Sequence, residues 1–162
     1  MKIGMRRLHL FILLFATCSL LFQLPPEAFA ADGDVSSTVA IASDTTNGPS
    51  LASGDLFGTS IANIGDLNGD GVNDLAVGAN YDDEGGDNRG AVHIMFMNTD
   101  GSVDSTAEIN DSTTNGPSLE DNDRFGRSIA NIGDLNGDGV NDLAVGADAD
   151  DEGGDKRGAG LL

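Results

Sequence analysis

Apolar and polar residues alternate with a period of two through most of the chain after residue 34, as in strands that bury one face. Gly-, Asn-, Asp- and Pro-rich turns separate these stretches, and no helical stripe of useful length lies between them. The pattern therefore predicts an all-β fold. The expected strands are Thr38–Ala42, Phe57–Ile64, Asp74–Ala79, Ala91–Met97, Thr106–Asn110, Phe125–Ile132 and Asp142–Ala147, with a short last strand from Gly158.

The first thirty residues have a different pattern. A basic start precedes an apolar run from Leu8 to Leu24, two prolines end that run, and Ala28-Phe29-Ala30 has the small-x-small form that signal peptidase cleaves. We expect residues 1–30 to be a secretory signal peptide cleaved after Ala30. The alternatives are an uncleaved membrane anchor, for which the run is short, and a lipoprotein at Cys18, where the lipobox is poor. The mature chain is then secreted or at the cell surface (extracellular or periplasmic), with no stable membrane span.

The remaining sequence repeats at an offset of 68 residues. Residues 61–79 and 129–147 are identical, and residues 43–91 and 111–159 differ at ten of 49 aligned positions. The repeat units are placed at 35–102 and 103–162. About four strands per unit is the arrangement of a β-propeller blade. The second unit ends at Leu162, before the counterpart of the strand Ala91–Met97 is complete, so we expect a C-terminally truncated unit and a fragment of a longer propeller.

The charge and the cysteine content narrow the possible partners. The chain carries a formal charge of −19, and removing the signal peptide, with three bases and one acid, makes the remainder more negative by two. The single cysteine, Cys18, leaves with it, so disulfides cannot stabilise the mature chain. So acidic a chain favours cations and disfavours nucleic acid and anionic lipid. Solubility or adaptation to a saline environment would also explain the acidity.

The identical stretch contains a pattern of oxygen ligands. Side-chain oxygens stand at loop positions 1, 3, 5 and 9, glycine at position 6 allows a sharp turn, and position 7 offers its backbone carbonyl, as in calcium-binding loops. The alternative is an Asx-rich turn without an ion. With no His or Cys in the set, zinc, copper and iron are disfavoured. We expect about one Ca²⁺ per repeat. The predicted ligands are Asp66, Asn68, Asp70, Val72 and Asp74, and in the second copy Asp134, Asn136, Asp138, Val140 and Asp142.

The residues after the loop exclude an EF-hand. The bidentate glutamate that an EF-hand carries at position 12 is replaced by Val77 and Val145. A strand pattern, Leu75-Ala76-Val77 in the first copy, stands where a helix would begin. The sequence therefore predicts a calcium loop inside a β-hairpin.

These motifs together resemble FG-GAP repeats. Each loop is preceded by a Phe-Gly pair, at Phe57-Gly58 and Phe125-Gly126, and followed by Val-Gly-Ala, at Val77-Gly78-Ala79 and Val145-Gly146-Ala147. The proline of the family's Gly-Ala-Pro motif is replaced by Asn80 in the first copy and by Asp148 in the second. The resemblance implies blades of the seven-bladed propeller found in integrin α subunits and many bacterial extracellular proteins. It also implies that the calcium is structural and lies on one face of the propeller, with ligands bound by loops of the opposite face.

Other candidate residues are weaker. The acidic run at 82–87 is interpreted as a solvated loop, with a second cation site as the alternative. Phe57 and Phe125 are expected in the core. His93 alternates with apolar neighbours and is expected to point outward, without a partner. The mature chain offers no nucleophile elbow and no hydrolytic triad, so it is not expected to be an enzyme.

Three functions fit these features. The first is an adhesion or protein-interaction module that binds an extracellular protein or glycan, with calcium in a structural role. The second is an accessory propeller segment of a secreted hydrolase whose catalytic domain lies elsewhere. The third is a truncated remnant without a function of its own.

Overall fold

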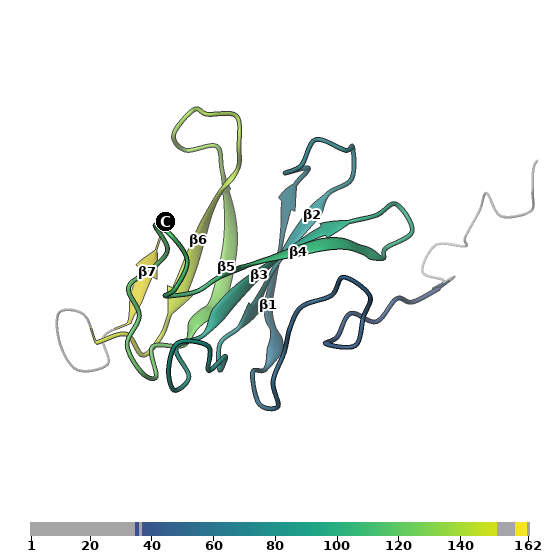
Figure 1. Ribbon diagram of the computed structural model, residues 1–162. Coiled ribbons are helices and arrows are strands. Elements are labelled where there is room, and N and C mark those ends of the chain that lie inside the picture. The colour runs from purple at the N-terminus through teal and green to yellow at the C-terminus, as the bar shows by residue number, and fades with distance from the viewer. Residues whose placement is uncertain (1–34, 36, 152–157, 162) are drawn as a thin grey trace, which may run out of the picture. The chain divides into compact units, whose positions relative to one another are not determined.

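The computed structural model describes residues 35, 37–151 and 158–161, and the predicted signal peptide lies outside them. The described part is all-β, as expected, with two antiparallel sheets (Figure 1). Within it, no helix is long and apolar enough to cross a membrane. The first sheet has the order β1-β2-β3-β4 and the second β5-β6-β7. The strands are β1 (Phe57–Gly65), β2 (Asp74–Ala79), β3 (Ala91–Met97), β4 (Val103–Ile109), β5 (Phe125–Gly133), β6 (Asp142–Ala147) and β7 (Ala159–Leu161).

One expected strand is wrong. Residues Thr38–Ala42 form no strand, although Ser37–Ile41 aligns with Ser105–Ile109 of β4. The alternation of these residues suits a strand, but a strand also needs a neighbour to bond with. β4 pairs with β3, the strand before it in sequence, and within the described residues no strand precedes Thr38. The two segments therefore share a similar alternating pattern, but among the described residues only the second copy has a preceding strand to pair with.

The sheets and the sequence repeats are out of phase. β4 lies at the start of the second sequence unit, but it completes the first sheet by pairing with β3. The turn between them fixes the register: the Asn98 N–H donates to the Ser102 carbonyl at 2.8 Å, and Gly101 takes a left-handed backbone. His93 consequently stands opposite Glu108. This pairing brings together residues from the two sequence units.

Strands β2 and β3 are buried on both faces. Ala76, Val92 and Ile94 belong to an apolar cluster that includes Phe125 and Val145 of the second sheet. The alternate residues of the same strands face the other way, where Val77 and Met95 are buried with Met97 and Val103, and Ile41 and Phe57 pack against them. The prediction that Phe57 and Phe125 lie in the core is confirmed: Phe125 is 3% exposed, and Phe57 is half-buried against the second apolar cluster.

The two sheets meet through backbone at two glycines. A Cβ atom on Gly78 in β2 would lie 2.0 Å from the carbonyl oxygen of Gly126 in β5. Gly126 has a φ of 84°, which side chains rarely adopt, and a Cβ there would lie 2.5 Å from the Ala91 oxygen. The Ser60 hydroxyl donates to the same Gly126 carbonyl at 2.7 Å. Glycine is therefore required at both positions by the close approach of the strands.

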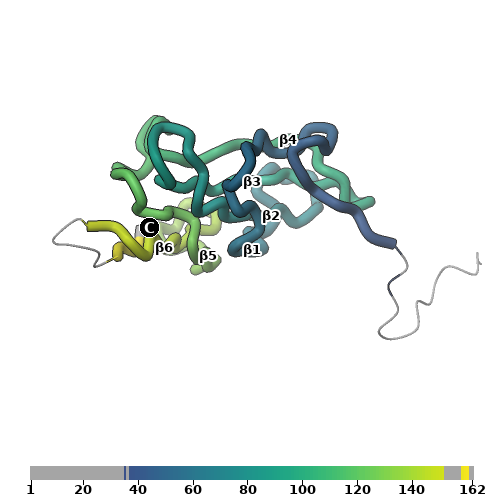
Figure 2. Tube along the Cα trace, turned by 90° about the horizontal axis from the view of Figure 1, so that it is seen from below, coloured from purple at the N-terminus to yellow at the C-terminus, as the bar shows by residue number. Residues whose placement is uncertain are grey.

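Further hydrogen bonds continue this contact along the sheets, which lie side by side in Figure 2. The Phe125 N–H donates to the Arg89 carbonyl at 2.8 Å. The Arg89 guanidinium forms ion pairs with Asp111 and Asp121, which precede β5. At the other end, the Asn141 side chain donates to the Ile64 carbonyl at 3.0 Å. The first sheet thus holds the start of β5 and the β5–β6 loop.

We predict that Gly78→Ala lowers the free energy of unfolding by about 3 kcal/mol, because the added methyl group overlaps backbone that can shift only by separating the sheets. The control is Gly146→Ala at the equivalent position of β6, where the nearest atom is the Ser128 hydroxyl oxygen and no backbone atom lies within 3.4 Å. It should cost about 1 kcal/mol or less. Urea unfolding followed by circular dichroism measures both, and equal costs would contradict the close contact.

Candidate metal centres

The two predicted calcium loops lie at the same end of the sheets (Figure 1). One connects β1 with β2 and the other connects β5 with β6. Most of their residues are exposed, including the side chains of Leu67 and Leu135. Apolar side chains that stay exposed contribute no burial free energy to the loop conformation. The loops are therefore held by hydrogen bonds of their backbone and side-chain oxygens.

The first carboxylate of each loop organises the turn. Asp66 Oδ1 accepts hydrogen bonds from the N–H groups of Gly69 and Asp70 at 2.8 and 2.9 Å, and Oδ2 accepts one from Gly71 at 2.8 Å. Asp134 makes the same three bonds in the second copy. Such side-chain-to-backbone bonds replace the backbone pairing that a tight loop cannot make. The loop is consequently curved around Asp66, and its counterpart around Asp134.

The last carboxylate of the loop has different surroundings in the two copies. Asp74 is fully buried, and its two oxygens accept hydrogen bonds from the N–H groups of Leu67 at 2.8 Å and Met97 at 3.0 Å. Asp142 is only half-buried and accepts from the Leu135 N–H at 2.6 Å and from the Asn136 amide at 3.4 Å. Asp74 therefore ties its loop to the end of β3, whereas the bonds of Asp142 stay within its own loop.

The loop side chains are partly brought together. The Asn68 amide donates to Asp70 Oδ2 at 2.9 Å, and Asp70 Oδ1 accepts the Val72 N–H at 2.8 Å. All the predicted donors are oxygens, which suits a hard cation such as Ca²⁺. Among the described residues, however, the three acids of a loop do not form a group with carboxylate oxygens within 4.8 Å of one another. Calcium in the loops stays a prediction.

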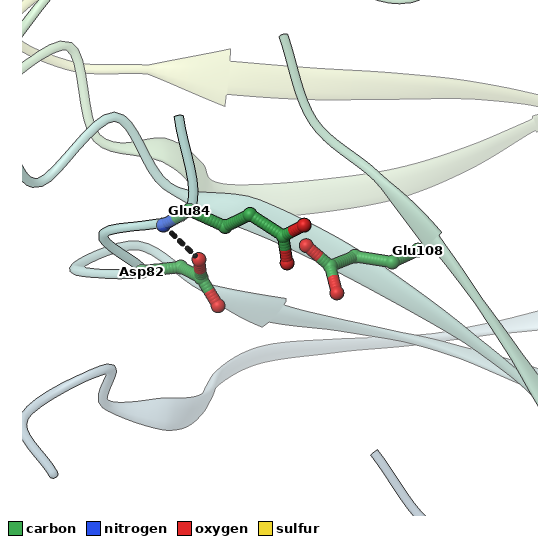
Figure 3. A group of neighbouring side chains, drawn as sticks. All are labelled: Asp82, Glu84 and Glu108. Carbon is green, nitrogen blue, oxygen red and sulfur yellow. Dashed lines mark hydrogen bonds between the residues drawn. The ribbon is translucent and has the colours of Figure 1, made fainter. Parts of the chain in front are cut away.

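Such a group does form at the opposite end of the first sheet. Asp82 and Glu84 lie in the β2–β3 connection, Glu108 lies in β4, and one oxygen from each is within 4.8 Å of the others. Figure 3 shows the carboxylates of Glu84 and Glu108 directed toward each other, with Asp82 beside them. We call these three residues the acidic cluster. Their chemistry is that of a possible metal-binding site.

His93 lies beside the acidic cluster, and the expectation that it points outward is wrong. It is 1% exposed, and its ring meets the Phe57 ring edge-on at a centroid distance of 5.6 Å. Its Nε2 is 3.9 Å from Asp82 Oδ2, and its Nδ1 is 3.9 Å from Glu108 Oε2. The expectation failed because both faces of β3 are covered: one by the second sheet and the other by the segment around Ile41 and Phe57.

Burial changes the pKa values of two groups in this region. It lowers the pKa of His93 below the usual value, although the negative charges of Asp82, Asp55 and Glu84 act to raise it. Burial likewise raises the pKa of Glu108; the Asn110 amide opposes the rise, and the charges of Asp82 and Glu84 add to it. The imidazole is therefore biased toward its neutral form and supplies little positive charge to the acids around it.

The sequence contained a signal for this cluster. The apolar run at 91–97 and the more polar segment at 103–109 flank a short turn, and pairing them as a hairpin places Glu108 opposite His93. The connection carrying Asp82 and Glu84 then reaches the same end of the sheet. The interpretation of 82–87 as a solvated loop holds for Glu84, which is exposed, but not for Asp82, which is 5% exposed.

Comparison with known families agrees with the sheets and the motifs. The FG-GAP repeat matches residues 57–95 and 125–162. The chain carries two FG-GAP repeats. Its two antiparallel sheets have the form expected of two FG-GAP propeller blades.

Integrin alpha chains are among the curated relatives of these FG-GAP repeats. The chain is 38% identical to Integrin alpha-PS5 of Drosophila melanogaster over 97 residues, which are 60% of the chain and 9% of that protein. It is 45% identical to Integrin alpha-3 of Mus musculus over 94 residues, 58% of the chain and 8% of that protein. It is 40% identical to Integrin alpha-6 of Homo sapiens over 108 residues, 66% of the chain and 9% of that protein. The chain thus spans less than a tenth of each relative.

We predict that Asp74→Ala destabilises the FG-GAP repeats more than Asp142→Ala does. Asp74→Ala leaves two backbone N–H groups without their charged acceptor, one of them in the core, and each such bond contributes about 1.5–3 kcal/mol. Asp142→Ala removes bonds at a half-buried site that water reaches, so its cost should be smaller by about 1–2 kcal/mol.

Chemical unfolding of both variants in millimolar Ca²⁺ measures this difference, because each variant loses the same position of its loop. A larger cost for Asp142→Ala would show that Asp74 does not tie its loop to β3.

Proposed function

We propose that the chain is an exported FG-GAP module for adhesion or protein interaction, stabilised by structural Ca²⁺ in its two loops. The observation that carries this proposal is the pair of identical nine-residue loops, at 66–74 and 134–142, within repeats similar to those of integrin alpha chains. The partner is an extracellular protein or glycan, and no catalytic role is proposed.

The loops support the calcium part of this proposal by their donors. Asp66 and Asp134 each hold a curved loop in place through three backbone N–H groups, so the side chains at positions 3 and 5 are presented from a fixed turn. The remaining coordination would come from the carbonyls of Val72 and Val140 and from water. Open, mostly exposed loops of this kind suit weak sites, with dissociation constants of about 10⁻⁴ to 10⁻³ M as in extracellular modules.

The interaction part rests on similarity and on surface character. Curated relatives of these repeats are integrin alpha chains, and the acidic composition disfavours nucleic acid and anionic membranes as partners. The loops that hold calcium occupy one end of the sheets, which leaves the other end for recognition of a partner. Export is inferred from the signal-peptide pattern of residues 1–30.

Calcium removal should unfold or loosen the protein. With the full chain in chelator we expect weaker β-sheet circular dichroism and more scattered light than in millimolar Ca²⁺, because the loop carboxylates then lack their counter-ion. The double variant Asp70→Ala, Asp138→Ala should behave in Ca²⁺ as the wild type does in chelator. A cooperatively folded monomer that is unchanged by chelator would contradict a structural role for calcium.

Export and surface retention can be measured together in cells that produce the full-length protein. We expect the chain recovered outside the cell to begin at Ala31 by mass spectrometry. It should remain on the cell surface in Ca²⁺ and be released by a chelator. The double loop variant should be exported but not retained. A chain that keeps residues 1–30, or whose retention is the same with and without Ca²⁺, would contradict the proposal.

A further inference from the structure

We infer that the acidic cluster of Asp82, Glu84 and Glu108 is a third Ca²⁺ site, separate from the two loops. It lies at the opposite end of the first sheet from the loop that precedes β2. An ion there would join the β2–β3 connection to β4. This inference does not depend on calcium binding by the loops, since it uses none of their residues.

The backbone around Asp82 holds its carboxylate in place. The Asp82 N–H donates to the Ala79 carbonyl at 3.0 Å, and its own carbonyl accepts the Gly90 N–H at 3.0 Å. Its Oδ1 accepts the Glu84 N–H at 2.8 Å, as Figure 3 shows, which also fixes where the Glu84 side chain begins. Asp82 Oδ2 makes no hydrogen bond to another described residue. One oxygen thus organises the turn, and the other faces the cluster.

Glu108 reaches the cluster from a different part of the sequence. Its Oε1 accepts the Asn110 amide at 2.7 Å, and its Oε2 faces the imidazole of His93. Its position in β4 is set by pairing with β3, so the strand and not a mobile loop presents this ligand. A site with one ligand from a strand and two from a braced turn is well ordered before an ion binds.

The strongest sign of a missing partner is the buried His93 ring. The side chain is 1% exposed, and Nε2 has no hydrogen-bond partner among the described residues although Asp82 Oδ2 stands 3.9 Å away. That distance is too long for a hydrogen bond. Leaving a buried polar nitrogen unsatisfied costs about 1–3 kcal/mol. A small shift of Asp82 on binding an ion would bring an acceptor to an Nε2–H, whereas a water on that ion would donate to an unprotonated Nε2.

The charge of the cluster also lacks compensation. In the described part, the ion pairs of Asp82 and Glu108 involve only His93, and both distances are 3.9 Å. The nearby cation Arg89 is held by Asp111 and Asp121. Three carboxylates within 4.8 Å repel one another in the partly buried setting of Asp82 and Glu108. A divalent cation relieves that repulsion directly.

The donors and their spacing select the ion. Oxygen atoms on one Ca²⁺ lie about 2.3–2.6 Å from it and so up to about 5 Å from one another, which covers the spacing of this cluster. Mg²⁺ requires near-ideal octahedral geometry at about 2.0–2.1 Å and usually keeps several waters, so three protein carboxylates suit it less well. Zn²⁺ prefers nitrogen or sulfur ligands. The His93 nitrogens lie beside the carboxylates and are not within the 4.8 Å group, so the imidazole is a neighbour of the ion, not its ligand.

The single tyrosine of the chain, Tyr81, directly precedes Asp82, and the chain has no tryptophan. Tb³⁺, a lanthanide substitute for Ca²⁺, can therefore be detected at the acidic cluster by tyrosine-sensitised luminescence. The loops report little in this assay, because the six residues of β2 separate them from Tyr81 by about 20 Å. With the full-length protein we expect a saturable signal that Ca²⁺ reverses.

Glu108→Gln and, separately, Glu84→Gln should each raise the Tb³⁺ concentration at half-maximal signal about tenfold or more, since affinity depends on the number of charged ligands. Asp104→Asn, at an exposed carboxylate on the same strand, should leave it unchanged. Circular dichroism checks that each variant folds, and Glu84 is exposed, so its variant should fold in any case. An unchanged titration in both glutamine variants, or a signal that Ca²⁺ cannot reverse, would overturn the inference.

Discussion

The close approach of Gly78 and Gly126 is the constraint on which the described structure depends. The Gly126 carbonyl oxygen occupies the space where a side chain on Gly78 would be, so the two sheets can pack backbone to backbone. This contact is a steric reason for glycine in Val77-Gly78-Ala79 of the first repeat and in Phe125-Gly126 of the second. It also brings Phe125 against the first sheet, where it is buried with Val92 and Val145. The core between the sheets depends on two residues that lack a side chain.

The same packing decides what happens at the two ends of the first sheet. Because the second sheet covers one face of β3 and the segment around Ile41 and Phe57 covers the other, the ring of His93 is buried. Its neighbours Asp82 and Glu108 are therefore drawn into a setting with little water, which raises the demand for a counter-ion. The predicted calcium loops at the opposite end are mostly exposed to solvent.

The two identical loops also show how context changes one residue. Asp74 and Asp142 occupy the same position in the same local sequence, yet Asp74 is fully buried and bonded to the end of β3, whereas Asp142 bonds only within its loop. The loop conformation itself hardly differs, because Asp66 and Asp134 hold it with the same three hydrogen bonds. Local bonds thus set the shape of the loop, and neighbouring strands set the environment of its last carboxylate.

Much of this molecule was readable from the sequence alone. Period-two alternation and turn residues predicted β2, β3 and β6 with their observed bounds, and the 68-residue repeat together with the Phe-Gly and Val-Gly-Ala motifs indicated FG-GAP repeats. Tertiary structure alone decided that Thr38–Ala42 forms no strand, that β4 completes the first sheet, and that His93 is buried next to Asp82 and Glu108. The reason is physical: alternation and turn chemistry act between neighbours along the chain, whereas strand pairing and burial depend on which distant segment covers each face.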